Sequence, residues 1–489
     1  MRALDLLIIL AYLAGVIAAG AWFSRRQRTT RQYFLGGRKV PWWAVSASIV
    51  ATETSTVTFI SVPGIIFAVG GDFAFLQMVF GYLLGRVAIS ILFIPSYFKG
   101  ELLTVYQLLQ ERFGPAVKAL AASLFVAMRT VADGIRLLLT AFVLAAVWSV
   151  FSGAGAPSPA VVAACVILLG AVMILFTFLG GMEAVIWIEV VQLGIYLTGA
   201  VAATLVLLRK VPGGWDTAMA LGEAHGKLRL FHFELDWARP FTFWSGLIGG
   251  CFLTMSTHGT DQYLVQRYLC TDSPRKARAA LLSSGAVVLV QFVLFLTIGL
   301  LLFAFYRPFE AGAAALAGDR IFPDFITRHM PPGLSGLVVA AIFAAALSSS
   351  LNSIAATTVA DLYRPLAPAR PDEHYLRVSR GVTVVAGLAQ IGVALAARAT
   401  SRSALDAVLS VASLLNGPVL GVFLLGSFSR RAGSTAALVG MSAGLAVVLT
   451  VRALTPLAWP WYAVVGSLTT LICGAAIGSF SRGSSQRPA

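Results

Sequence analysis

The chain has 489 residues, of which 58% are hydrophobic and 12% are charged, and its formal net charge is +15. A soluble domain contains about 25% charged residues, so this composition excludes a soluble globular protein and indicates a protein of the lipid bilayer. The basic residues lie mostly in short loops between apolar runs, which favours membrane topology over nucleic-acid binding. The cysteines have no CxxC spacing and predict neither a disulfide nor a metal framework. We expect no nucleic-acid partner and no obligate protein partner.

Apolar segments long enough to cross a membrane recur along the whole chain. A hydrocarbon core requires about 20 apolar residues per helix. The sequence predicts 13 such helices, at residues 4–23, 42–69, 73–99, 116–150, 159–180, 183–208, 241–266, 277–306, 333–361, 377–398, 404–428, 432–453 and 457–479. The first is expected to be a retained span, because it lacks a basic leading region and a clear cleavage site. The predicted fold class is an all-α polytopic membrane protein, with residues 1–489 forming a single integral membrane domain.

Basic residues in the connecting loops predict the orientation of the chain. They follow spans one, seven, nine and eleven, and are Arg25, Arg26, Arg28, Arg31, Arg38, Lys39, Arg267, Arg275, Lys276, Arg278, Arg364, Arg370, Arg377, Arg380, Arg430 and Arg431. All these loops lie on one side if the N-terminus is outside. The longer loops 209–240 and 307–332 then lie on the other side. The sequence therefore predicts a multi-pass protein of the cell membrane, with the N-terminus outside and the C-terminus cytoplasmic.

Two apolar segments are interrupted by polar residues. Six of the eleven residues in IVATETSTVTF (49–59) are Ser, Thr or Glu, and STHGTD (256–261) interrupts the seventh span. The two spans are five apart and so cross in opposite directions, which suggests an inverted repeat of spans 2–6 and 7–11. Such repeats place broken helices at the midplane, where they hold ions and substrate. The alternative is an ordinary helix whose hydroxyls bond to carbonyls one turn earlier.

Five stretches, in chain order, resemble the sodium:solute symporter family, which includes sodium–glucose, sodium–proline and sodium–sialic acid cotransporters. They are FLGGRKVPWWAVSASIVATETS (34–55), GGMEAVIWIEVVQ (180–192), GTDQYLVQR (259–267), SSSLNSIAATTVADLYRP (348–365) and GPVLGVFLLGSFSRRAG (417–433). The resemblance covers nearly the whole chain and implies a LeuT-like core of five plus five helices in an inverted repeat. It divides the chain into an extra first span with a basic cytoplasmic loop (1–40), a first repeat (41–208), a second repeat (241–430) and two extra C-terminal spans (431–489).

The resemblance also implies a sodium ion and its ligands. In the family, two backbone carbonyls come from the first core helix, and a carbonyl and two hydroxyls come from an A-x-x-S-S/T pattern in the eighth. The matching positions here are Ala51, Thr54, Ala345, Ser348 and Ser349. Five hard, mostly neutral oxygens suit a monovalent ion. Between this pattern and the downstream Asp-Leu-Tyr element, the chain is a few residues shorter than its relatives. If the chain were aligned with its relatives on the Asp-Leu-Tyr element instead of on the A-x-x-S-S/T pattern, no hydroxyl would remain at the ligand positions.

Glu53 between these carbonyls, the hydroxyl residues just past them and residues on the next helix are the candidates for solute binding. They are Glu53, Ser55, Thr56, Thr58, Phe73 and Gln77, with Asp261 and Tyr263 from the other half of the repeat. Glu53 lies where proline-type members have Asp and sugar-type members have Asn. It could strengthen a cation site, meet a cationic group of the solute or bind a proton; pairing with a buried Arg is the structural alternative. For Asp261, the alternative is capping of the helix break.

A second cation site is possible at Glu189 with Ser350. Glu189 replaces an Asp that some relatives use at such a site, so the charge is kept on a side chain one methylene longer. The alternative is that Glu189 pairs with arginines near the cytoplasmic side.

The segment MRTVADGIRLLLTA (128–141) carries two arginines and one aspartate in an apolar helix. The spacing places Arg129, Asp133 and Arg136 on one face, where they can pair. One acid cannot neutralise two arginines, so a spare guanidinium could pair with Glu53 or bind a carboxylate bidentately. Sialic-acid-type relatives use an arginine on this helix for the solute carboxylate, and the sequence leaves open which arginine corresponds.

These features together predict a secondary active transporter and not an enzyme. It would move a small organic solute (a sugar, sugar acid, amino acid or carboxylate) with sodium by alternating access. The alternative is a proton-coupled symporter or a uniporter of the same fold. A channel is disfavoured because no filter loop is repeated, and an enzyme because no HExxH, GxSxG or P-loop occurs.

Overall fold

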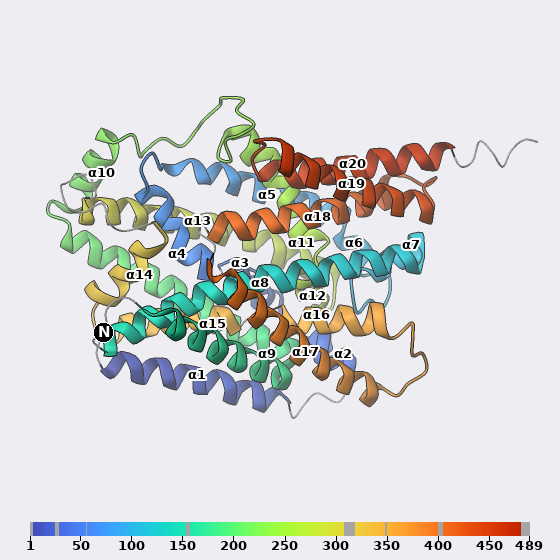
Figure 1. Cartoon of the computed structure of the whole chain (residues 1–489), viewed down its shortest axis with the longest axis horizontal. Helices are drawn as coiled ribbons and strands as arrows, with labels where there is room; N and C mark the ends of the chain where they lie inside the picture. The colour runs from blue at the N-terminus through green and yellow to red at the C-terminus, as the bar shows by residue number, and fades with distance from the viewer. Residues whose placement is uncertain are drawn as a thin grey trace, which may run out of the picture.

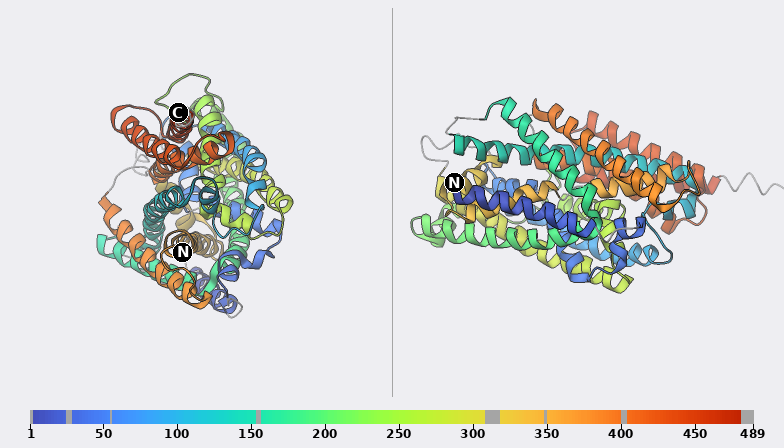
Figure 2. Two further views of the ribbon diagram at one scale, coloured as in Figure 1. Left: turned by 90° about the vertical axis from the view of Figure 1, so that its right-hand side faces the viewer. Right: turned by 90° about the horizontal axis from the view of Figure 1, so that it is seen from below.

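Long helices with nearly parallel axes form a bundle (Figure 1). The left view of Figure 2 looks along these axes. The computed structural model describes residues 3–24, 29–54, 56–152, 157–307, 318–347, 350–399 and 404–480. Within these ranges every regular element is a helix, which confirms the all-α prediction.

The first half of the chain runs from α1 to α10. Its elements are α1 (Ala3–Ser24), α2 (Thr30–Leu35), η1 (Gly36–Arg38), α3 (Trp42–Glu53), α4 (Thr56–Phe67), η2 (Phe73–Phe75), α5 (Leu76–Leu92), α6 (Ile94–Tyr97), α7 (Gln107–Phe113), α8 (Pro115–Ser152), α9 (Pro159–Lys210) and α10 (Gly214–Ala224).

The second half begins with a short π-helix. Its elements are η3 (Ser245–Gly249), α11 (Gly250–Gly259), α12 (Gln262–Leu269), α13 (Pro274–Tyr306), α14 (Gly318–His329), α15 (Leu334–Leu347), α16 (Leu351–Thr357), η4 (Thr358–Tyr363), α17 (Asp372–Ala396), η5 (Ala397–Ala399), α18 (Ala404–Phe428), α19 (Ser434–Leu454) and α20 (Pro460–Phe480). Helix α1 and the pair α19–α20 lie at opposite sides of the bundle (Figure 1).

Nine helices in the described ranges are long and apolar enough to cross a membrane, and ten if the bent pair α3–α4 counts as one span. The predicted spans 159–180 and 183–208 join in the single element α9, which changes direction at Gly181, where φ is +60°. Two further predicted spans, 241–266 and 333–361, are divided into shorter helical pieces. The total of 13 crossings therefore stays a prediction.

Both predicted interruptions are breaks in the structure. Helix α3 ends at Glu53, and the axis bends by 53° between α3 and α4. Helix α11 ends at Gly259, and Asp261 caps α12 by accepting a hydrogen bond from the backbone N–H of Tyr263 at 2.9 Å. The interpretation of 49–59 as one ordinary helix is thus wrong, whereas the capping expected for Asp261 is present.

Threonine hydroxyls donate hydrogen bonds to backbone carbonyls around the first break. The hydroxyl of Thr54 donates to the Val50 carbonyl at 2.6 Å, and that of Thr58 donates to the Glu53 carbonyl at 2.8 Å. The Val50 carbonyl also accepts the Thr54 N–H at 2.8 Å. Unpaired backbone groups are costly at membrane depth, so the Thr58 hydroxyl stabilises the break by pairing with the Glu53 carbonyl.

Candidate functional site

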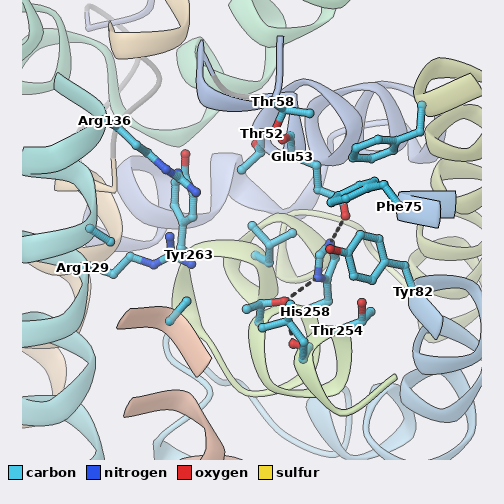
Figure 3. Close-up of a pocket in the computed structure, with 16 residues that line it drawn as sticks. Thr52, Glu53, Thr58, Phe75, Tyr82, Arg129, Arg136, Thr254, His258 and Tyr263 are labelled. Atoms are coloured by element: carbon cyan, nitrogen blue, oxygen red, sulfur yellow. Dashed lines mark hydrogen bonds and ion pairs between the residues drawn. The ribbon is translucent and has the colours of Figure 1, made fainter. Parts of the chain in front are cut away.

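A cavity of about 120 Å³ lies where the two broken helices meet. Its walls come from α3, α4, α5, α8, α11, α12, α13 and α18, with Phe75 of η2. Five of the predicted solute-binding residues line it: Glu53, Thr58, Arg129, Arg136 and Tyr263. In Figure 3 the two arginines and Tyr263 lie on one side of the cavity, and Glu53 with His258 lies on the other. The site therefore has a basic end and an acidic end.

The acidic end is built around the Glu53 carboxylate. Glu53 forms an ion pair with Arg86 of α5, and its Oε1 lies 3.2 Å from Nε2 of His258. Arg86 is 1% exposed and also donates to the Tyr82 carbonyl at 3.2 Å. The structural alternative for Glu53, pairing with a buried arginine, is therefore observed.

Sequence reasoning missed Arg86, although a signal for it was present. It is an isolated arginine in the apolar segment 73–99, and ionisable residues inside a membrane span mark functional sites by default. What the sequence could not supply was the partner, because α3 and α5 are joined only by tertiary packing. Of the two possibilities open for a spare arginine of α8, pairing with Glu53 is not observed among the described residues, since Glu53 pairs with Arg86.

The basic end is built on α8. Arg129 forms an ion pair with Asp261, the cap of α12, instead of sharing Asp133 with Arg136. Asp133 lies 3.4 Å from Arg136 and accepts hydrogen bonds from the backbone and hydroxyl of Ser350. The predicted three-residue pairing is thus only partly correct. The Nε of Arg136 is buried and has no hydrogen-bond partner within the described part of the chain.

Tyr263 separates two guanidinium groups. Its ring centre lies 4.5 Å from the guanidinium carbon of Arg129 and 4.6 Å from that of Arg267. A cation over an aromatic face is attracted by the ring quadrupole. Tyr263 therefore stabilises two buried positive charges while it lines the cavity.

Glu189 adjoins the cavity residue Thr52 and is fully buried. Its carboxylate accepts a hydrogen bond from Arg267 Nη2 at 2.5 Å, and further bonds from the hydroxyls of Ser48 and Thr52. Arg267 is also fully buried, so its assignment to a basic loop was wrong. Ser350, the other residue of the possible second cation site, donates a hydrogen bond to Asp133. The contacts described for Glu189 and Ser350 are therefore with different partners.

The residues expected to bind sodium are described only in part. Ala51 lies in the last turn of α3, Thr54 follows it, and Ala345 lies in α15. Ser55, Ser348 and Ser349 fall outside the described residues, and Thr56 is the first residue of α4. Next to Thr54, the Gln291 amide donates to the Thr54 hydroxyl at 2.5 Å, while its buried carbonyl oxygen has no hydrogen-bond partner among the described residues. A buried neutral oxygen of this kind is a ligand type that suits a monovalent cation.

Phe73 and Gln77 are not among the residues that line the cavity. The Gln77 amide donates to the Phe241 carbonyl at 3.3 Å and accepts from the His232 backbone at 3.1 Å. These bonds join α5 to the long loop before η3. Phe75, two residues away, lines the cavity in its place.

The same loop contacts the C-terminal end of α4 through a buried amine. Lys227 is 3% exposed and donates to the carbonyls of Ile66 at 2.5 Å, Ala68 at 2.9 Å and Gly71 at 3.3 Å. Burial lowers the pKa of Lys227 from 10.5 to about 8, because desolvation disfavours the charged form. The C-terminal end of α4 is thereby tied to the loop.

Comparisons with known proteins agree with this architecture. The sodium:solute symporter family model matches residues 33–444. The sodium/sialic acid symporter NanT of Aliivibrio fischeri is 33% identical over 491 residues, covering 96% of this chain and 92% of that protein. A Na+-coupled sialic acid symporter, solved substrate-bound and outward-open, has a TM-score of 0.86 at 30% identity and covers 98% of each chain. A nucleobase-cation-symport-1 family transporter shares the fold, with a TM-score of 0.56 at 16% identity. All residues of the cavity lie within the matched region.

Proposed function

The chain belongs to the sodium:solute symporter family, and from that premise we propose that its solute is a sugar acid whose carboxylate binds Arg136. Membership makes the protein a secondary active transporter of the membrane, with a LeuT-like inverted-repeat fold. It couples a small organic solute to sodium by alternating access, in which two halves of the molecule rock about a central site.

The observation that carries the proposal is the free donor of Arg136. Arg129 has a close anionic partner in Asp261, whereas Arg136 reaches Asp133 only at 3.4 Å and has a buried Nε with no partner in the described ranges. The Arg136 side chain is 24% exposed and lines the cavity. A guanidinium that borders a cavity and has only a long contact to its acidic neighbour is suited to bidentate binding of a carboxylate.

The remainder of the cavity supports a solute with hydroxyl groups. Four threonine side chains line it, at positions 52, 58, 254 and 257. Hydroxyls can both donate to and accept from a sugar, and the rings of Phe75, Tyr82 and Phe292 add apolar walls. The relatives named above as sialic acid symporters carry a solute of this class, a sugar that bears a carboxylate.

Uptake by proteoliposomes tests the proposal. With an inward sodium gradient, we expect uptake of radiolabelled sialic acid to be competed by other sugar acids more strongly than by neutral sugars or proline. Arg136→Gln should raise the solute half-saturation concentration about tenfold or more, because a charge-assisted hydrogen bond contributes roughly 1.5–3 kcal/mol. Arg229→Gln is the matched control, since Arg229 forms an exposed pair with Glu234. Equal competition by neutral sugars and acids, or no effect of Arg136→Gln, would contradict the assignment.

We also propose that sodium binds between the first and eighth core helices. The proposed ligands are Ala51, Thr54, Ala345, Ser348 and Ser349. The buried, unpaired oxygen of Gln291 beside Thr54 supports this position. The combined variant Ser348→Ala with Ser349→Ala should raise the sodium half-saturation concentration and remove the stabilisation by sodium that wild-type protein should show against choline. An unchanged sodium response would exclude these hydroxyls as ligands.

The orientation of the chain is a further part of the proposal. We propose that the N-terminus is outside and the C-terminus cytoplasmic, with repeats at 41–208 and 241–430, because the basic loops then share one side. Single cysteines introduced at Asp272 and Glu223 in a cysteine-free background test it. An impermeant maleimide applied outside should label position 223 and not position 272, and the reverse would invert the topology.

A further inference from the structure

The N-terminal helix α1 supplies one buried carboxylate to the start of α15. Asp5 is fully buried, and its Oδ1 accepts three hydrogen bonds. The donors are the Gly333 N–H at 2.7 Å, the Ser335 hydroxyl at 2.8 Å and the Gly336 N–H at 2.9 Å. The two helices lie side by side at the end of the bundle where the chain begins (Figure 1). A side chain distant in sequence thus acts as the cap of α15.

Two physical effects make this contact favourable. The first N–H groups of a helix have no partner within the helix, and Gly336 is only the third residue of α15. The carboxylate satisfies that N–H and places a negative charge at the positive end of the helix dipole. Close approach requires glycine at position 336, because a Cβ there would lie 2.5 Å from the Cα of Asp5.

We propose that Asp5 is a positioning residue for sodium coupling. Helix α15 has 14 residues, and Ala345, a proposed sodium ligand, lies in its last turn. A helix of this length spans about 21 Å, and fixing the axial position of its first turn fixes that of its last turn as well. Ion ligands tolerate displacements of only about 0.2 Å, so a shift of α15 would weaken binding of the ion. The inference rests on the sodium site proposed above.

Asp5 lies outside the part of the chain that the family model covers, which begins at residue 33, whereas its three donors lie within it. Helix α1 also precedes the ten-helix core. The inference therefore assigns a role in ion binding to a helix that contributes no residue to the cavity.

The test is the sodium dependence of solute uptake in proteoliposomes, measured at saturating solute. Asp5→Asn keeps the shape and removes the charge, and Asp5→Ala removes all three bonds. We expect the sodium half-saturation concentration to rise about threefold in the first and about tenfold in the second, in line with the energy of a charge-assisted hydrogen bond. The solute half-saturation concentration at saturating sodium should change less than about twofold, because the cavity residues keep their places.

Two further variants keep the test decisive. Gly336→Ala keeps the Asp5 carboxylate but forces α1 and α15 apart at this contact, so it should also raise the sodium half-saturation concentration. Leu7→Ala is the matched control on α1, since Leu7 is 64% exposed, and it should leave sodium dependence unchanged. If Asp5→Ala fails to fold, Asp5→Asn and Gly336→Ala still decide the question.

A lower melting temperature with unchanged sodium dependence in Asp5→Asn and Gly336→Ala would overturn the inference and reduce Asp5 to a stability residue. Unchanged sodium dependence in these variants, with loss of the response in the paired serine variant, overturns the positioning role alone. An intact sodium response in the variant that combines Ser348→Ala with Ser349→Ala overturns the proposed ion site. The positioning role of Asp5, which acts on that site through α15, is then overturned as well.

Discussion

Glu53, the last residue of α3, forms an ion pair with Arg86 in the middle of α5. The pair lies beside the cavity at the level of the helix break, with the Arg86 side chain 1% exposed and the Glu53 side chain 14% exposed. His258 approaches the same carboxylate from the second broken helix. The acidic end of the site therefore joins the two halves of the repeat.

This arrangement predicts how substitution of Glu53 affects stability. Glu53→Gln leaves a buried guanidinium without a charged partner, and breaking a buried pair in this way lowers the free energy of unfolding by about 3–5 kcal/mol. We expect a large fall in melting temperature in detergent. Combining Glu53→Gln with Arg86→Met should recover most of it, because both charges are then absent. Glu101→Gln is the control, since its pair with Arg31 is exposed and contributes about 0–1 kcal/mol. Equal effects of the two single substitutions would argue against a buried pair.

A second prediction concerns Glu189. Its carboxylate is bonded to the Arg267 guanidinium, so Glu189→Gln should destabilise the protein without lowering the sodium-to-solute ratio. The ratio can be measured from the membrane potential at which uptake reverses. Glu189→Asp should retain more stability than Glu189→Gln, because it keeps the charge. A folded Glu189→Gln variant that carries one sodium fewer per solute would instead support the second cation site.

A third prediction separates the ring of Tyr263 from its hydroxyl. Tyr263→Phe keeps the aromatic face between Arg129 and Arg267, so its melting temperature should stay close to that of wild type. Tyr263→Leu loses both cation–π contacts and should lower the free energy of unfolding by about 1–4 kcal/mol. Thermal unfolding of the two variants measures the difference. Similar losses in both would show that the hydroxyl, and not the ring, stabilises the guanidinium groups.

A fourth prediction follows from Lys227. Burial lowers its pKa to about 8 in the folded protein, against 10.5 in an unfolded chain. Between these values the unfolded chain binds more protons, so the contribution of Lys227 to stability rises with pH, by about 3 kcal/mol at most. Below pH 8 both states are protonated and the contribution is constant.

Lys227→Met isolates this effect, because other groups also titrate in alkaline solution. The melting temperature of wild type minus that of Lys227→Met should increase from pH 8 to pH 10.5. A difference that stays flat across this range would mean that the amine is not desolvated.

Several features of the protein follow from its sequence. The apolar segments determine a helical membrane protein, because hydrocarbon leaves backbone groups no partner but the helix itself. The break at 49–59 follows from clustered threonines, and the break near Asp261 from a short polar run, because both are local properties of the chain. The family motifs, read in order, were sufficient to identify a sodium symporter.

Only the tertiary structure decided which charges meet. Arg129 and Asp133 are one helical turn apart, yet Arg129 pairs with Asp261, which is 132 residues away. Arg86, Arg267 and Asp5 find their partners on helices that sequence spacing does not relate. Each such pairing depends on the relative position of two packed helices, and a buried charge is stable only where packing brings an opposite charge or several donors to it. The sequence by itself thus determined the helices, their breaks and the kind of transport, whereas packing determined the ion pairs that shape the site.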